Sequence, residues 1–263
     1  LTCPSNVTEA ACQTQAAIDG KFSNWLNTFS FSGGCNPVYT NNNSGAPMAC
    51  GGSKSVTFTV TSDCEAPKTC VATFTVTNAP VVILSCPSNV TENSCQSQTD
   101  INNKFNAWLG TASFTGGCNG VLTNSGGTAP DRCGGSRSVT FTVTSDCEAP
   151  KTCVATFTVT NAPAVILTCP ANKTEAACQS QADIDTKYNN WIATAMFTGG
   201  CNGVMTNNAP APPNRCGGST VAVTFTVTSD CEAPKTCEAF FTVDPAPAVV
   251  LTCPNNVTEA ACQ

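Results

Sequence analysis

One segment constrains this chain more than any other, because it occurs three times without a single change. The sequence VTFTVTSDCEAPKTC spans Val56–Cys70, Val139–Cys153 and Val223–Cys237. Its first half alternates valine or phenylalanine with threonine, and this period of two is typical of a half-buried β-strand. A similar alternation follows the segment. We therefore predict a β-hairpin in each of the three copies.

The register of the hairpin is predicted with Pro67 at its centre. In this register Cys64 faces Cys70 and Val60 faces Phe74, all on the apolar face. A slip of one residue would turn the apolar side chains to solvent, so the face is strongly specified. Two cysteines opposite each other on one face meet the requirement for a disulfide. The predicted bonds are Cys64–Cys70, Cys147–Cys153 and Cys231–Cys237.

The sequence around the hairpin is repeated as well. The motif Leu-x-Cys-Pro places the first cysteine of each copy at Cys3, Cys86, Cys169 and Cys253, with spacings of 83, 83 and 84 residues. Repeats of this length are domain-sized, unlike the ~20–45-residue units of solenoids. Short Ala/Pro junctions without a Gly/Ser linker predict semi-rigid spacing and an extended array. The predicted domains are 1–83, 84–166 and 167–250, with 251–263 as the truncated start of a fourth.

Cysteine content indicates the compartment. The chain holds 20 cysteines and no histidine, and an even count at fixed spacing in small units predicts a disulfide framework outside the cell. Zinc is not expected, since no Cys-x-x-Cys pair is present. A unit of ~83 residues has a modest core, which disulfides would reinforce. The framework comprises Cys3, Cys12, Cys35, Cys50, Cys64, Cys70, Cys86, Cys95, Cys118, Cys133, Cys147, Cys153, Cys169, Cys178, Cys201, Cys216, Cys231 and Cys237.

Each repeat also predicts one short amphipathic helix. Within 9–28, Ile18, Phe22, Trp25 and Leu26 fall at i, i+4, i+7 and i+8, the spacing of a helical apolar stripe. The tryptophan is interpreted as a core residue and not as a ligand-stacking platform. The segments that differ most between repeats are predicted loops, namely Thr40–Ala49, Thr123–Arg132 and Thr206–Arg215.

Charge and composition exclude several function classes. The net charge of −6 argues against nucleic acid or an anionic membrane as partner. The longest apolar run, Val81–Leu84, is too short to span a bilayer. Without histidine there is no Ser-His or Cys-His pair, so the chain is predicted not to be an enzyme. The missing signal peptide suggests a segment of a longer secreted protein.

Acidic pairs beside a cysteine could hold calcium. Asp63 and Glu65 flank Cys64, and oxygen ligands suit calcium, but such a pair is more often a solvated turn. No cofactor is therefore expected. The threonine face of the hairpin could bind a ligand, although cross-strand Thr pairs simply stabilise a sheet. Phe240 interrupts that face and is predicted to mark a subunit contact. The pair Asp63/Glu65 recurs as Asp146/Glu148 in the second repeat and as Asp230/Glu232 in the third.

The order of these motifs resembles a known family of repeats. LTCP, a second cysteine about nine residues on, a Gly-Cys turn and TFTVTSDC-x5-C are similar to HYR-like, immunoglobulin-like repeats. These occur in tandem in very large surface proteins of gliding and filament-bearing bacteria, commonly exported by the type IX system. The resemblance covers the whole chain and implies a mainly β fold of tandem immunoglobulin-like β-sandwich domains. With the helix and the cysteine framework predicted above, each domain is expected to have one short amphipathic helix and three disulfides. It transfers no catalytic residues, and the helix departs from the simplest members.

In a seven-strand-type sandwich the first strand begins at the pole of the last hairpin's turn. This arrangement favours Cys3–Cys35 and Cys12–Cys50. Sequential pairing, Cys3–Cys12 and Cys35–Cys50, stays open, although an extended span of nine residues covers ~30 Å and would have to bend. The corresponding favoured disulfides are Cys86–Cys118 and Cys95–Cys133 in the second repeat, and Cys169–Cys201 and Cys178–Cys216 in the third.

These observations lead to two functional hypotheses. The first is a structural segment of a long extracellular bacterial filament or adhesin, a disulfide-stapled semi-rigid stalk. The second is an adhesive module that binds a glycan or a protein through the variable loops. Expected partners are further copies of the same repeat, in a homo-oligomeric filament or with a surface partner, without nucleic acid or membrane insertion. The fragment Leu251–Gln263 is predicted to be stranded, with the partner of Cys262 beyond the chain.

Overall fold

The computed structural model describes residues 1–259. The expectation for Cys262 lies outside the described residues. The chain forms two compact units, whose limits run through the second repeat, so the predicted domain boundaries stay a prediction. The first unit comprises Leu1–Glu92, Gln98–Pro130 and Ser136–Thr158, and the second comprises Asn93–Ser97, Asp131–Gly135 and the chain from Val159 onward.

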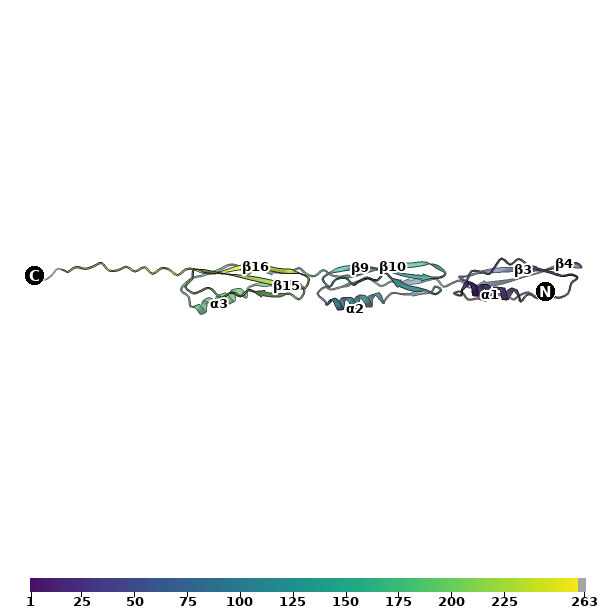
Figure 1. The fold of residues 1–263 in the computed structure, drawn as a ribbon, viewed down its shortest axis with the longest axis horizontal. Helices are drawn as coiled ribbons and strands as arrows, with labels where there is room; N and C mark the ends of the chain where they lie inside the picture. The colour runs from purple at the N-terminus through teal and green to yellow at the C-terminus, as the bar shows by residue number, and fades with distance from the viewer. Residues whose placement is uncertain (260–263) are drawn as a thin grey trace. The chain divides into compact units, whose positions relative to one another are not determined.

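A group of strands with one helix occurs three times along the chain (Figure 1), and the second and third groups contain two short strands more than the first. The first copy contains β1 (Val7–Glu9), α1 (Gln15–Leu26), β2 (Val38–Asn41), β3 (Gly52–Ser62) and β4 (Glu65–Val76). The second contains β5 (Ile83–Ser85), β6 (Val90–Glu92), α2 (Gln98–Leu109), β7 (Ser113–Thr115), β8 (Val121–Asn124), β9 (Gly135–Ser145) and β10 (Glu148–Val159). The third contains β11 (Ile166–Thr168), β12 (Lys173–Glu175), α3 (Gln181–Ile192), β13 (Met196–Thr198), β14 (Val204–Asn207), β15 (Ser219–Ser229) and β16 (Glu232–Val243).

Each copy is built on a four-stranded sheet. The strand orders are β1-β4-β3-β2, β6-β10-β9-β8 and β12-β16-β15-β14. The hairpin strands are antiparallel, and β1 adds to the sheet parallel to β4, with Val7 beside Phe74. Two-stranded ribbons, β5-β7 and β11-β13, pair the opening of a repeat with the segment after its helix. The predicted mainly β chain of immunoglobulin-like sandwich repeats, each with one short helix, is confirmed.

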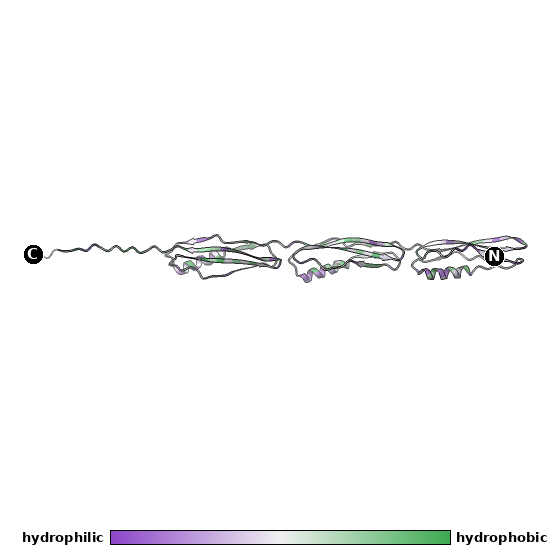
Figure 2. Ribbon diagram, turned by 45° about the horizontal axis from the view of Figure 1, so that its top comes forward, coloured by the Kyte–Doolittle hydropathy of each residue, from purple (hydrophilic) through white to green (hydrophobic). Residues whose placement is uncertain are grey.

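The core lies between the sheet and the helix. Alternate hairpin residues are buried, and Ile18, Phe22 and Trp25 of α1 pack onto them, as the helical stripe predicted. The Trp25 ring meets Phe74 edge-on at 5.6 Å between centroids. Its Nε1–H donates to the Ser5 carbonyl oxygen at 2.8 Å. The tryptophan is thus a satisfied core residue. In Figure 2 the helices carry both purple polar and green apolar residues.

The predicted register of the hairpin is wrong, whereas the predicted faces are right. The chain turns at Asp63 and Cys64, where Ser62 pairs with Glu65, and not at Pro67. Cys70 consequently faces Phe58 instead of Cys64. Predicted and observed registers differ by an even number of residues. Because side chains alternate with a period of two, an even slip leaves the same residues on the apolar face. The alternation alone could therefore not locate the turn.

Replacing Phe157 with alanine tests the sheet–helix core. Phe157 is 1% exposed and meets the ring of Phe105 edge-on. Its loss should lower the free energy of opening of β9 and β10 by about 3–5 kcal/mol, measured by hydrogen exchange and mass spectrometry. Val154 lies in the same strand but is 63% exposed, so Val154→Ala is the matched control. Equal effects of the two substitutions would contradict this core.

One ion-pair cluster ties the third helix to its sheet. The Lys187 Nζ atom lies 2.7 Å from a carboxylate oxygen of Glu175, and Lys173 lies 3.1 Å from the other. The hydrogen bond from Lys187 is the main reason that the pKa of Glu175 falls to about 2. A carboxyl group with a lowered folded-state pKa stabilises the fold at pH values above its unfolded pKa.

The stability of the third repeat should therefore depend on pH through Glu175. Its contribution is complete above pH 4.5, the ordinary pKa, and is lost as the pH falls toward about 2. Glu175→Gln should flatten this part of the pH dependence in thermal melts followed between pH 6 and pH 2. Glu238→Gln, which changes an exposed carboxylate on the outer face of β16, serves as control. If the melting temperature of Glu175→Gln still falls with pH as it does in the native chain, Glu175 does not contribute to the pH dependence of stability.

Candidate functional site: a two-disulfide junction

Among the cysteines that the structure describes, one disulfide in each of the three repeats joins two cysteines of the same repeat. It links the first cysteine to the sixth, with a Cα–Cα distance of about 6 Å. The predicted pairs Cys64–Cys70 and Cys3–Cys35 are therefore wrong, as are their copies. Cys70 faces the core beside Phe58, where the opening segment brings Cys3 into contact. The three bonds are Cys3–Cys70, Cys86–Cys153 and Cys169–Cys237.

Four further disulfides join one repeat to the next. The second cysteine of a repeat bonds to the third of its successor, and the fourth bonds to the fifth. Cys12 bonds to Cys118, with Cα atoms 4.8 Å apart, and Cys50 bonds to Cys147, with Cα atoms 5.3 Å apart. The same pattern gives Cys95–Cys201 and Cys133–Cys231. The predicted pair Cys12–Cys50, its copies and the sequential pairs are wrong as well.

The sheet explains why these cysteines bond outside their own repeat. Cys12 follows β1 and Cys50 precedes β3, and both strands meet β4 at Val76, so both cysteines lie at one end of the sheet. Cys35 lies at the other end, because its carbonyl accepts from the N–H of Asp63 at the hairpin turn. The prediction that Cys12 and Cys50 share a pole was sound, but each one bonds to the adjacent repeat.

Five of the described cysteines carry no disulfide. The sequence predicted that four of them belong to the intra-repeat framework, and the structure leaves all five as exposed thiols. The Cys64 thiol is hydrogen-bonded to Cys35, and this bond raises the pKa of Cys64. The unpaired cysteines are Cys35, Cys64, Cys178, Cys216 and Cys253.

The peptide between the first two repeats is held along its length in the first unit. The N–H of Ala79 donates to the Cys50 carbonyl at 2.9 Å, and the N–H of Gly117 donates to the Pro80 carbonyl at 2.8 Å. The N–H of Val82 donates to the carboxylate of Glu148. Val82 itself is only 4% exposed. Junctions of this kind consist of two disulfides and a hydrogen-bonded connecting peptide.

A glycine is required where the connecting peptide passes over the next repeat. Gly116 has φ of +75°, and a Cβ atom there would lie 2.0 Å from the Val81 carbonyl oxygen. Gly199 makes the same approach to Ala164 in the second unit. The Gly-Gly-Cys turn of the sequence therefore serves the junction. The sequence alone does not indicate this role, because Gly-Gly occurs in turns of many kinds.

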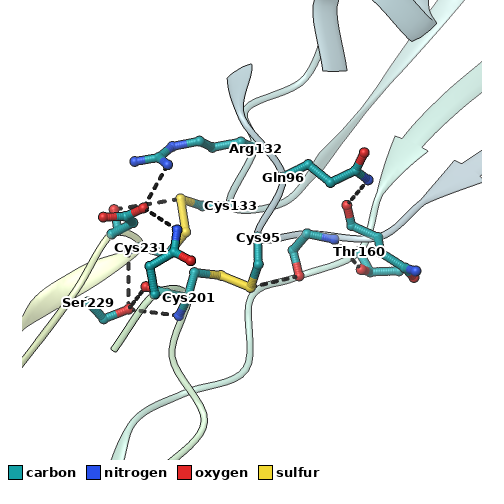
Figure 3. Close-up of a disulfide and its surroundings, with 12 residues drawn as sticks. Cys95, Gln96, Arg132, Cys133, Thr160, Cys201, Ser229 and Cys231 are labelled. Atoms are coloured by element: carbon teal, nitrogen blue, oxygen red, sulfur yellow. Dashed lines mark hydrogen bonds and ion pairs between the residues drawn. A yellow bond between two sulfur atoms is a disulfide. The ribbon is translucent and has the colours of Figure 1, made fainter. Parts of the chain in front are cut away.

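The second unit contains the same junction with an added ion pair (Figure 3). Arg132 Nη1 lies 2.8 Å from a carboxylate oxygen of Asp230, beside the bond between Cys133 and Cys231. The amide of Asn202 and then Arg132 hold the pKa of Asp230 below its usual range. Val165 donates its N–H to Glu232, as Val82 does to Glu148.

The acidic pairs thus have partners in the protein. Glu148 and Glu232 accept from connecting peptides, and Asp230 is bound by Arg132 and Asn202. Within residues 1–259, no group of three or more His, Cys, Asp or Glu residues is placed to hold a metal ion. No helix in that part of the chain is long and apolar enough to cross a membrane.

Other predicted surface sites show no clustered chemistry. The Ser55 and Thr73 hydroxyl groups on the polar face bond to each other at 2.9 Å, as in a stabilising cross-strand pair. Phe240 is 39% exposed on the outer face of β16, and its predicted contact with another subunit stays a prediction. The same holds for ligand binding by the variable loops.

Comparison with known proteins gives only distant likenesses. No family model and no curated protein matches the sequence. The protocadherin structure PcdhgB3 EC1-4 is 8% identical over 74% of this chain, which spans 58% of that structure, with a TM-score of 0.30. Mouse cadherin-23 EC22-24 is 9% identical, with coverage of 80% and 86% and a TM-score of 0.31. A three-Ig structure of titin is 8% identical, with coverage of 80% and 88% and a TM-score of 0.25. At such scores the likeness carries no argument about function.

Peptide mapping without reduction tests the junction directly. After digestion of the oxidised chain, mass spectrometry should find Cys12 linked to Cys118 and Cys50 linked to Cys147. Alkylation before digestion should label Cys35 and Cys64 in the monomer, because both are exposed thiols. A linked Cys12–Cys50 peptide, or a linked Cys64–Cys70 peptide, would contradict the arrangement described here.

Proposed function

We propose that the chain is a load-bearing structural segment of an extracellular filament or adhesin stalk, without catalytic activity. The observation that carries this proposal is the set of disulfides between successive repeats. Each of them closes a loop of about 100 residues, with sequence separations of 106, 97, 106 and 98. Successive loops overlap along the sequence. Every peptide bond from Cys12 to Cys231 consequently lies inside at least one loop that joins two repeats.

Such overlap changes how tension passes through the chain. The shortest covalent path runs from the N-terminus to Cys12, across to Cys118, along the backbone to Cys133, across to Cys231 and onward. Most of the hairpins and all three helices lie off this path. Tension applied to the ends therefore passes through disulfides and short backbone segments. The helices and the two hairpin strands of the first and second repeats lie off this path, whereas β1, β8 and β16 lie on it.

The setting implied by this chemistry is extracellular. Disulfides persist in oxidising compartments, and small secreted domains depend on them. The resemblance to HYR-like repeats of bacterial surface proteins supports the filament or adhesin assignment, including export by the type IX system. Partners of the chain would be further repeats of the same kind. A glycan- or protein-binding role for the variable loops has no specific contact to favour it.

Pulling a single chain by its two ends tests the load-bearing role. A fully reduced chain of 263 residues should extend to about 900 Å, at ~3.3–3.6 Å per residue. The oxidised chain should reach a maximum extension of about 200 Å, because only the backbone segments on the shortest path can lengthen. Single-molecule force spectroscopy with and without a reductant measures both lengths.

Two variants make this test specific. Cys12→Ser with Cys118→Ser removes one disulfide from the shortest path and should lengthen the oxidised chain measurably. Cys253→Ser removes an unpaired cysteine and should leave the extension unchanged. If the oxidised native chain extends as far as the reduced one, the disulfides do not carry the load and the proposed function fails.

A further inference from the structure

Two aromatic residues of the first repeat have no aromatic counterpart in the other two repeats. Phe29 follows α1 and stands where the second repeat has Ala112. Tyr39 belongs to β2 and stands where the second repeat has Leu122. The third repeat has alanine and methionine at these two positions. The difference lies in the residue types themselves, so any surface that needs both rings is particular to the first repeat.

A third difference in sequence explains why the ring of Phe31 joins them. In the second repeat the Phe114 ring lies over Gly120, where an added Cβ atom would be 2.4 Å from it. Pro37 stands at the position of Gly120 in the first repeat, and its side chain excludes the same placement of Phe31. The centroid of the Phe31 ring lies 6.2 Å from that of Phe29. Phe29, Phe31 and Tyr39 therefore form one aromatic cluster.

Packing against the core fixes the aromatic cluster in place. The Phe29 ring stacks on the core residue Phe58 with centroids 4.9 Å apart, and on Tyr39 with centroids 4.7 Å apart. Phe31 and Tyr39 are each 37% exposed. Part of the aromatic surface thus faces solvent while its other contacts hold it still. Such a surface can stack on a ligand at little cost in conformational entropy.

The aromatic cluster lines a cavity of ≈ 460 Å³. This volume lies within the range of ~300–1,000 Å³ for small-molecule sites, which combine apolar walls with a few polar groups. The polar groups here are the side chains of Asn27, Ser30 and Asn41. None of the described residues that line the cavity carries a charge at neutral pH. The cavity therefore suits an uncharged ligand.

Hydrogen bonds orient the polar rim of the cavity. The Nδ2 atom of Asn41 donates to the Tyr39 hydroxyl at 2.7 Å, and Oδ1 of Asn41 accepts from the N–H of Asn43 at 3.0 Å. The Tyr39 hydroxyl consequently accepts one bond and keeps its own hydrogen for an acceptor on a ligand. Carboxamide and hydroxyl groups both donate and accept, as the hydroxyl groups of a sugar do.

We propose that this cavity binds a neutral pyranose unit of an extracellular polysaccharide. The face of an aromatic ring is electron-rich and attracts the C–H groups on one side of a sugar ring. The amides of Asn27 and Asn41 and the hydroxyl of Ser30 bond to the sugar hydroxyl groups. A charged sugar would lose hydration without gaining an ionic partner. The site does not depend on the load-bearing role, because all its residues belong to the first repeat.

Fluorine NMR can show where a sugar binds. The chain contains two tyrosines, Tyr39 and Tyr188, and Tyr188 is only 2% exposed in the third repeat. The full oxidised chain labelled with fluorotyrosine should therefore give two signals, which the Tyr39→Leu variant assigns. Cellohexaose, mannohexaose and chitohexaose serve as neutral probes. At least one of them should shift the Tyr39 signal and leave the Tyr188 signal in place.

Two variants of β2 make the test specific. Tyr39→Leu introduces the residue that the second repeat carries at this position, so the fold should be kept while the stacking ring is lost. It should weaken binding of the same sugar about tenfold or more in calorimetry. Val38→Ala changes a neighbouring residue that is 58% exposed and does not line the cavity, and should leave the affinity unchanged. The native chain should bind one sugar chain per protein, because the aromatic cluster occurs once.

Three results would overturn the proposal. The first is that no neutral hexasaccharide shifts the Tyr39 signal. The second is that the anionic hexagalacturonate, or the planar aromatic ligand adenosine, binds more tightly than every neutral sugar. The third is that Tyr39→Leu and Val38→Ala weaken sugar binding equally. A thermal melt of Tyr39→Leu like that of the native chain would show that its loss of binding is local.

Discussion

The disulfide that leaves each repeat is the constraint on which the rest of the molecule depends. The bond from Cys12 to Cys118 requires the end of the first sheet and the Gly-Cys turn of the second repeat to lie side by side, and the two Cα atoms are 4.8 Å apart. That geometry requires a short connecting peptide, and the structure holds this peptide through Ala79, Pro80 and Val82. Close passage over the next repeat in turn requires glycine at Gly116. The hydrogen-bonded connecting peptide and the glycine of the turn thus fit the same covalent contact.

The elements within a repeat were readable from the sequence because they follow local rules. Ile18, Phe22 and Trp25 share a helix face, and they are buried as that spacing requires. Val56, Phe58 and Val60 alternate with threonines, and they too are buried. The turn of the hairpin was not readable, since an even slip preserves the buried face. Asp63 and Cys64 form the turn, and Pro67 lies within β4, where a missing N–H is tolerated at an unpaired strand edge.

The junction was not predictable, because the sequence of one repeat does not show which end of the sheet each cysteine reaches. Six cysteines in one unit could all bond to each other, yet in the first repeat Cys3 and Cys70 are the pair that does so. The acidic residues were similarly assigned to a solvated turn or to calcium. Glu148 instead accepts from the peptide that enters its repeat. In a tandem array the same residue appears in every copy, so an intra-repeat contact and an inter-repeat contact leave the same pattern in the sequence.

The two junctions differ in one charged contact. Arg132 pairs with Asp230 in the second unit, whereas the equivalent position in the first repeat is Ala49. An exposed ion pair contributes ~0–1 kcal/mol, while a disulfide typically contributes ~2–4 kcal/mol. Loss of the charge therefore leaves a junction that is still closed by two covalent bonds. The cysteines, glycines and connecting peptide must recur in every copy. The ion pair can be present or absent, because the two disulfides already hold the junction together.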